Sequence, residues 1–481
     1  MIQYKQREKH KCLPRRIARL SLFVAALVSA PLVANAEEWP PFREHTGVLP
    51  DGTAWLIRTP ENWNGTLLRD LDFATGVAGN VAGRYRDLLS RGYAFAGLAR
   101  HPLRLWQYDP QREIENLQQV QAIFSQEERV PDRVLQYGCS GGGHVGLASA
   151  EEFADKIDGA VILAAHTPVW IMKSYLDGWF AMQALLGAGY ESEGLGAASE
   201  LEIVHLPNSV RQDGRGLADI QASWRRAIEA AGATPEGRAR IALAFAIGQW
   251  SPWQSESDEL PDLTDTQVMA ELIVRSAIRI AGNVGGTSRL IFENAASGQQ
   301  LSGNEDVDYV AFYEAGAPVM KELVERLYAE ANLDINADLA QINASTKVTS
   351  SDYALNFWSQ PGRTVRGNLQ VPAIRIHMLG DNAIPYTLMQ GYETLVEENG
   401  KGDFYRQALV NAAGHCEFTA AESTAIVEAM MKRLDTGEWP EISAVSLNDM
   451  AEDLETDTQS RFMNDDEWRV SAFNRAWLPE E

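Results

Sequence analysis

Cysteine is scarce in this chain, which contains three cysteines among 481 residues. Cys12 lies in a basic N-terminal segment, and no cysteine stands at the end of that segment, which argues against a lipoprotein. Cys139 and Cys416 remain. In an oxidising compartment two such thiols are expected to pair, and the bond would hold two distant loops together.

Positive charge is also scarce, because 42 lysines and arginines stand against 66 aspartates and glutamates, for a formal net charge of −24. So acidic a chain repels nucleic-acid phosphates and anionic lipid headgroups. We therefore expect neither nucleic acid nor a membrane as a partner of the mature protein. A small-molecule substrate fits this composition better.

A long apolar run is missing, and the longest one belongs to a targeting segment. The chain is basic from Lys5 to Arg19, mostly apolar over residues 20–33, and then reads Ala34-Asn35-Ala36. Together these features form the pattern of a secretory signal with its cleavage site, and the apolar run is short for a membrane span. We expect a signal peptide over residues 1–36 and a periplasmic or secreted protein.

Strand-like and helix-like segments alternate in two parts of the chain. The predicted strands cover residues 53–58, 66–73, 93–99, 133–137, 158–165, 371–378 and 403–410. The predicted helices cover residues 77–90, 113–124, 145–153, 386–398 and 420–434. This alternation indicates βαβ units and an α/β fold, with a mainly parallel sheet flanked by helices.

The alternation is interrupted by a long, mostly helical segment rich in tryptophan, which we interpret as a lid inserted into the α/β fold. The predicted organisation is a catalytic domain over 37–168 and 369–436, a lid or cap over 169–368 and an acidic C-terminal extension over 437–481. Some lid aromatics must form its core. Trp170, Trp179 and Phe180 come soon after the 158–165 strand, so we expect these three to face the substrate.

One short stretch has the pattern of a nucleophile. Gly138, Ser140 and Gly142 form Gly-x-Ser-x-Gly between a predicted strand ending at Tyr137 and a predicted helix beginning at Val145. In this context the serine lies on a strained turn, and only small residues fit two positions before and after it. The first N–H groups of the helix then point at the reacting centre. The alternative is a glycine-rich turn without chemistry.

A serine nucleophile needs a histidine base and an acid that orients the base. The chain order serine, acid, histidine is that of the α/β-hydrolases, and it predicts Ser140, Asp381 and His415 here. His415 lies in a small-residue loop after the last predicted strand, and Asp381 follows the strand before it. The rival acids Asp352 and Asp403 lie in the lid and at the start of a strand.

The oxyanion donors are predicted from the same pattern. We expect the Gly141 N–H to be the first donor, and the second to come from the loop at Phe73 or Ala74. The His-Gly pair usual in that loop is missing, and Arg69, Asp70 and Asp72 stand in its place. The alternative is that these charged side chains contact the substrate or pair with each other. His144 follows the serine too closely to be the base, and we expect it near the substrate.

These residues resemble a known family. Cys139-Ser140, Asp381 and His415-Cys416 match the CS-D-HC arrangement of the tannase and fungal-type feruloyl esterase family, over roughly residues 55–168 and 370–435. The resemblance implies a Cys139–Cys416 disulfide, an α/β-hydrolase fold and ester hydrolysis through an acyl-enzyme, with feruloyl-like or galloyl-like esters as the nearest substrates. The calcium loop of that family is absent, so no metal or organic cofactor is expected.

The sequence therefore predicts an exported serine carboxylic ester hydrolase. Two alternatives stay open. A peptidase or amidase would use the same three residues. A catalytically inactive binding protein of this fold is favoured only by Leu71-Asp72-Phe73, which replaces the usual glycine-rich oxyanion segment.

Overall fold

The computed structural model describes residues 39–255, 260, 262–282, 284, 287–473 and 475–479. The signal peptide predicted over residues 1–36 lies outside this part of the chain. Among the described residues, no helix combines the length and the apolar character that crossing a membrane requires.

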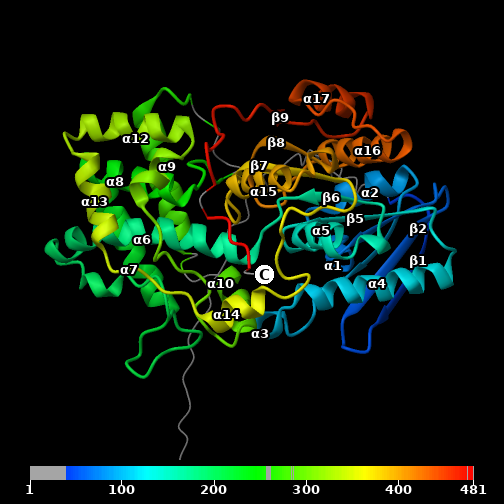
Figure 1. Cartoon of the computed structure of the whole chain (residues 1–481), viewed down its shortest axis with the longest axis horizontal. Coiled ribbons are helices and arrows are strands. Elements are labelled where there is room, and N and C mark those ends of the chain that lie inside the picture. Colours follow the sequence, from blue (N-terminus) through cyan, green and yellow to red (C-terminus); the bar gives the residue numbers. More distant parts are fainter. Residues whose placement is uncertain are drawn as a thin grey trace, which may run out of the picture. The chain divides into compact units, whose positions relative to one another are not determined.

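In the described residues nine strands form one sheet, in the order β1-β2-β4-β3-β5-β6-β7-β8-β9 (Figure 1). Their bounds are β1 Phe42–Val48, β2 Ala54–Pro60, β3 Thr66–Asp70, β4 Ala94–Leu98, β5 Arg133–Cys139, β6 Gly159–Leu163, β7 Ala373–Asp381, β8 Tyr405–Gly414 and β9 Phe462–Met463. The strands from β4 to β8 in this order pair in parallel, whereas β1, β2 and β9 pair antiparallel. This confirms the predicted α/β fold, and the strand order is that of the α/β-hydrolases.

Every residue of β3, β4 and β6 is buried, because helices cover the sheet. Strands buried on both faces read as continuous apolar runs, which is why the sequence revealed them. The helices α2 Ala82–Ser90, α4 Pro110–Glu127, α5 Gly141–Glu152 and α15 Thr387–Glu398 connect parallel strands, and α16 Ala420–Thr436 follows β8. α4 has Asp109 as its N-cap and Pro110 in its first turn, a good start for a helix.

The strand predicted over residues 66–73 is shorter in the structure. β3 ends at Asp70, whose Oδ1 accepts a hydrogen bond from the Asp72 N–H at 2.9 Å, and this local turn ends the ladder. Phe73 instead begins the short helix α1, Phe73–Gly76. Its ring stacks on Phe95 at a centroid distance of 4.8 Å.

Helices fill the chain between β6 and β7, and Figure 1 shows most of them in green on one side of the sheet. Their bounds are α6 Pro168–Ser192, α7 Leu217–Gly232, α8 Pro235–Gly248, α9 Thr266–Ala281, α10 Thr287–Ala295, α11 Tyr309–Glu314, α12 Pro318–Glu330, α13 Ile335–Ala344 and α14 Asp352–Trp358. Buried tryptophans pack at their centre, with Trp179 at 4.9 Å from Trp224 and 5.5 Å from Trp250 between ring centroids. We refer to the segment from α6 to α14 as the helical insertion.

The C-terminal extension packs into the fold. After α17, Ala444–Asp453, the chain pairs β9 with β8 and buries Trp468. The Trp170 indole N–H donates to the Trp477 carbonyl at 3.0 Å, and Arg475 forms a buried ion pair of 2.6 Å with Asp177. Both contacts join the extension to α6.

Candidate active site

The turn between β5 and α5 has the predicted strand–turn–helix geometry. Ser140 lies there with φ 58° and ψ −117°, a strained conformation for a residue with a side chain. Its N–H donates to the Leu163 carbonyl of β6 at 3.0 Å, which holds the turn in place. A Cβ on Gly138 would lie 2.9 Å from the Gly142 carbonyl carbon, so the close backbone approach requires glycine there.

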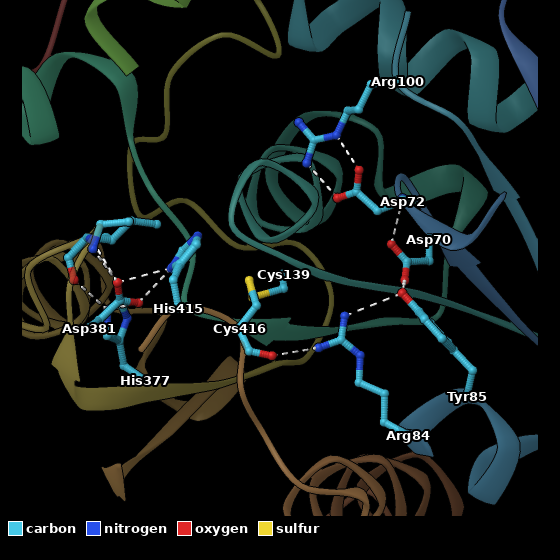
Figure 2. The surroundings of a disulfide bond; sticks show 12 residues. Asp70, Asp72, Arg84, Tyr85, Arg100, Cys139, His377, Asp381, His415 and Cys416 are labelled. Atoms are coloured by element: carbon cyan, nitrogen blue, oxygen red, sulfur yellow. Dashed lines mark hydrogen bonds and ion pairs between the residues drawn. A yellow bond between two sulfur atoms is a disulfide. The ribbon is translucent and has the colours of Figure 1, made fainter. Parts of the chain in front are cut away.

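A disulfide joins Cys139 to Cys416, with their Cα atoms 6.1 Å apart and a sequence separation of 277 residues. This confirms the predicted pairing. Cys139 directly precedes Ser140 in the sequence, and Cys416 directly follows His415. Figure 2 shows the bond between the two cysteines beside His415. The bond therefore holds the loop of the candidate base next to the turn of the candidate nucleophile.

Asp381 and His415 meet at the carboxyl ends of β7 and β8. Asp381 is the ladder partner of Gly414, which places His415 one residue beyond the pair. His415 Nδ1 lies 3.0 Å from each carboxylate oxygen of Asp381. Asp381 also accepts hydrogen bonds from the N–H groups of Ala383 at 2.8 Å and Ile384 at 2.9 Å, so the carboxylate is fixed in its orientation.

The electrostatics of this pair favour an ionised acid beside a basic imidazole. Burial alone would raise the pKa of Asp381, but the charge and hydrogen bond of His415 hold it below its usual value. Burial alone would lower the pKa of His415, but Asp381 outweighs burial and raises it. His377 lies 3.5 Å from Asp381, and its Nε2 is 3.0 Å from the Ile384 carbonyl. Burial lowers the pKa of His377 to about 4, so this imidazole is neutral at pH 7.

The loop after β3 lies against the serine turn. A Cβ on Gly142 would be 3.6 Å from both Asp70 Oδ1 and the Leu71 Cβ. Phe73 and Ala74, the predicted sources of the second oxyanion donor, form the first residues of α1 directly after this loop. The predicted donor segment thus follows directly on residues that lie against Gly142 of the serine turn.

A buried polar chain connects that loop with the histidine loop (Figure 2). The Tyr85 hydroxyl donates to Asp70 Oδ2 at 2.6 Å, and Arg84 donates to the Tyr85 hydroxyl and to the Cys416 carbonyl, each at 3.3 Å. Burial and the charge of Asp72 raise the pKa of Asp70 to about 6. This hydrogen-bonded network could not be predicted from the sequence, because its members come together only in the folded protein.

Arg100 is another residue near the site that the sequence analysis missed. It follows β4, and its Nε and Nη2 donate to the Asp72 carboxylate, the latter at 2.5 Å (Figure 2). Its position directly after a strand of the sheet is the available signal, because ligands of α/β sheets bind at the carboxyl ends of the strands.

His144 is buried on α5, and its ring stacks on His166 at a centroid distance of 5.5 Å. Burial lowers the pKa of His144 to about 4, so the ring is uncharged. Trp170, Trp179 and Phe180 are buried in α6, and Phe180 stacks on Tyr309 at 5.6 Å. The described ring contacts of these three aromatics are with the helical insertion and the C-terminal extension. A role for any of the four in substrate binding stays a prediction.

The described residues contain no cluster of three or more histidine, cysteine, aspartate or glutamate side chains arranged to hold a metal ion.

Comparison with known proteins defines the family. No protein-family model matches the chain. Feruloyl esterase B from Aspergillus oryzae superposes with a TM-score of 0.38 at 15% identity, covering 83% of this chain and 81% of that one. The acylaminoacyl peptidase of Pyrococcus horikoshii gives a TM-score of 0.36 at 8% identity, covering 87% and 46%. The fold assignment rests on the strand order and the serine turn, and the tannase and feruloyl esterase family stays a resemblance.

The sequence of o-phthalyl amidase from Xanthobacter agilis is 53% identical over 442 residues, which are 91% of this chain and 98% of that protein. Because the match covers nine-tenths of the chain, it includes the helical insertion as well as most of the sheet. Identity of this extent supports a serine hydrolase that acts on esters or amides. The chain belongs to the family of o-phthalyl amidase.

Proposed function

We propose that this hydrolase cleaves the amide bond of o-phthalyl amides through Ser140, His415 and Asp381. The observation that carries the proposal is the 53% identity to o-phthalyl amidase over nearly the full length of both proteins. The amide alternative of the sequence analysis is thereby preferred over ester hydrolysis. The hydrogen-bonded Asp381–His415 pair, held beside the serine turn by the disulfide, supports the assignment of the three residues.

In the proposed mechanism His415 accepts the Ser140 hydroxyl proton through Nε2 while Oγ attacks the amide carbonyl carbon. Asp381 holds the Nδ1–H tautomer and stabilises the imidazolium that forms. The Gly141 N–H donates to the oxyanion, together with an N–H at Phe73 or Ala74. His415 then protonates the leaving amine. The phthalyl-enzyme ester is hydrolysed by a water molecule that gives its proton to His415, and Ser140 is released.

Ester hydrolysis is a second candidate, favoured by one observation. The Cys139–Cys416 bond joins the neighbours of the serine and the histidine, as in the tannase and feruloyl esterase arrangement that the sequence resembles. The same acyl-enzyme would form from an aromatic ester, with an alcohol as the leaving group. We also propose that the protein is exported, because structural disulfides persist mainly in oxidising compartments.

The test is hydrolysis of matched substrates by the purified protein and by Ser140→Ala. The substrates are a phthalic acid monoamide, the corresponding monoester and methyl ferulate. We expect turnover of the monoamide and a loss of at least ~10³-fold in Ser140→Ala. Ser90→Ala, at the exposed end of α2, is the matched control.

Each outcome of this test has a defined meaning. Turnover of esters without amides would favour the second candidate. Activity that survives in Ser140→Ala would remove Ser140 from the mechanism. No turnover, with no fluorophosphonate adduct at Ser140, would support the inactive binding protein.

A further inference from the structure

A guanidinium group lies against the first residue of α5. A Cβ on Gly141 would be 2.5 Å from Nη1 and 3.1 Å from Nη2 of Arg100. Gly141 is the first helical residue after Ser140 and is not among the residues with positive φ, so its backbone would tolerate a side chain. The missing side chain instead makes room for Arg100 beside the proposed oxyanion donor.

Asp72 orients this guanidinium. Nε and Nη2 of Arg100 both donate to the Asp72 carboxylate, in the two-point geometry that fixes the plane of an arginine fork. Nη1 donates to no group among the residues that the structure describes. The pair is partly buried, with 14% of the Arg100 side chain and 28% of the Asp72 side chain exposed. Arg100 therefore presents an unused donor in a fixed direction next to the serine turn.

The surroundings add positive charge. Arg104 begins the short helix α3, Arg104–Gln107, and its Nε is buried without a hydrogen-bond partner. Burial and then the charge of Arg100 lower the pKa of Arg104, so the two guanidinium groups are within electrostatic range. The acidic groups that face Arg100 are Asp72 and the buried Glu113, whose pKa is raised to about 6 by burial.

The same charge also acts on the candidate base. Burial and Asp381 dominate the pKa of His415, and the charge of Arg100 adds a smaller lowering effect. Arg100 is thus linked by geometry to Gly141 and by electrostatics to His415. An anionic group on the acyl part of a substrate would be attracted to this side of the serine turn.

We propose that Arg100 determines specificity for acyl groups that carry a carboxylate ortho to the scissile carbonyl, by donating from Nη1 to that carboxylate. The proposal rests on the proposed function. In an o-phthalyl amide the carboxylate and the amide carbonyl stand on adjacent ring carbons. A donor beside the Gly141 N–H therefore reaches the carboxylate while the amide oxygen occupies the oxyanion site. Nothing is transferred in this contact, and the carboxylate stays ionised.

The experiment compares two amides of the same amine, one with the ortho carboxylate and one in which that carboxylate is its methyl ester. The readout is the ratio of their kcat/KM values, because a general loss of activity cancels in it. We expect the wild-type ratio to favour the carboxylate, and Arg100→Gln to reduce the ratio roughly 10- to 150-fold, as for a lost hydrogen bond to a charged group. Arg129→Gln, an exposed partner of Asp132, is the matched control.

Arg100→Lys is the second variant, because it keeps a positive charge beside Asp72 but lacks the planar fork. We expect an intermediate ratio from it. It also carries the test if Arg100→Gln does not fold. Equal losses on both amides would show that Arg100 only supports the loop through Asp72, and an unchanged ratio in either variant would equally overturn the proposal. A wild-type protein inactive on both amides would instead overturn the proposed function.

Binding of the product gives a readout without turnover. Phthalate should raise the melting temperature of Ser140→Ala more than benzoate does, because a ligand that binds only the folded state stabilises it. The difference should disappear in Ser140→Ala/Arg100→Gln. Equal shifts by both anions in Ser140→Ala would contradict a carboxylate contact at Arg100.

Discussion

At the scale of single residues, opposing effects on the pKa of His415 are expected to govern how kcat/KM depends on pH. In the proposed mechanism the neutral imidazole of His415 is the base, so kcat/KM should rise with pH through the pKa of His415. Asp381 and Glu417 raise this pKa, while burial and Arg100 lower it, and the net shift is upward. The acidic limb of the profile should therefore lie above the ordinary histidine value of about 6.5.

Asp381→Asn removes the largest raising contribution and leaves burial in place. We expect the limb to move to lower pH and kcat to fall by about 10⁴-fold, because the tautomer is no longer fixed. The measurement is a pH profile of kcat/KM, with Asp403→Asn as the control for the rival acid. A limb that stays in place in Asp381→Asn would assign the titration to another group.

Gly138 tests the packing of the serine turn. In Gly138→Ala the new methyl group would lie 2.9 Å from backbone of Gly142, which must shift. We expect a loss of about 1–3 kcal/mol in the free energy of unfolding. Gly83→Ala on α2, where the nearest atom would be 3.7 Å away, should be neutral or stabilise by up to about 1 kcal/mol. Urea unfolding measures the free energy of unfolding of both variants. Equal values would contradict the close approach of Gly138 to the Gly142 backbone.

At the scale of helices and strands, prediction succeeded where burial and local geometry agree. The β5–α5 turn was identifiable because glycine is needed at both sides of Ser140. β1 was missed because it is an edge strand with mostly exposed side chains. The end of β3 was misplaced because the Asp70 side chain, not the apolar pattern, stops the ladder. The contact of Arg84 with the Cys416 carbonyl could not be recognised, since it spans 332 residues of sequence, and Arg100 offered only its position after β4 as a signal.

The disulfide is the strongest test at this scale. Replacing both Cys139 and Cys416 by alanine removes the constraint on a loop that spans 277 residues of sequence. The chain-entropy model limits the resulting loss in the free energy of unfolding to about 5 kcal/mol. We expect lower stability and lower kcat, because His415 would no longer be held beside Ser140. Reductant should lower the free energy of unfolding of the wild type by a similar amount, and it should leave the double variant unchanged because that variant has no disulfide to reduce. Free thiols in the native protein, detected by intact mass, would contradict the bond.

At the scale of the whole molecule, the C-terminal extension is tied to the helical insertion by charge. The Asp177 carboxylate is fully buried, and its partners are Arg475 at 2.6 Å and the Tyr309 hydroxyl at 2.8 Å. Arg475→Met would leave a buried carboxylate without its cation, which typically costs about 3–5 kcal/mol. Asp177→Asn in the same chain should restore much of that loss. Additive losses in this double-mutant cycle would show that the two residues act independently.

The helical insertion also has a consequence for how the protein is made. β6 and β7 are neighbours in the sheet, yet all helices of the helical insertion are synthesised between these two strands. Cys139 precedes its partner by 277 residues, so at about 5–20 residues per second the ribosome needs roughly 14–55 s to deliver Cys416. During that interval the nascent chain carries Ser140 without its proposed base, and β6 has one edge unpaired. Under the proposed mechanism the newborn chain therefore has no hydrolytic site until His415 has been synthesised.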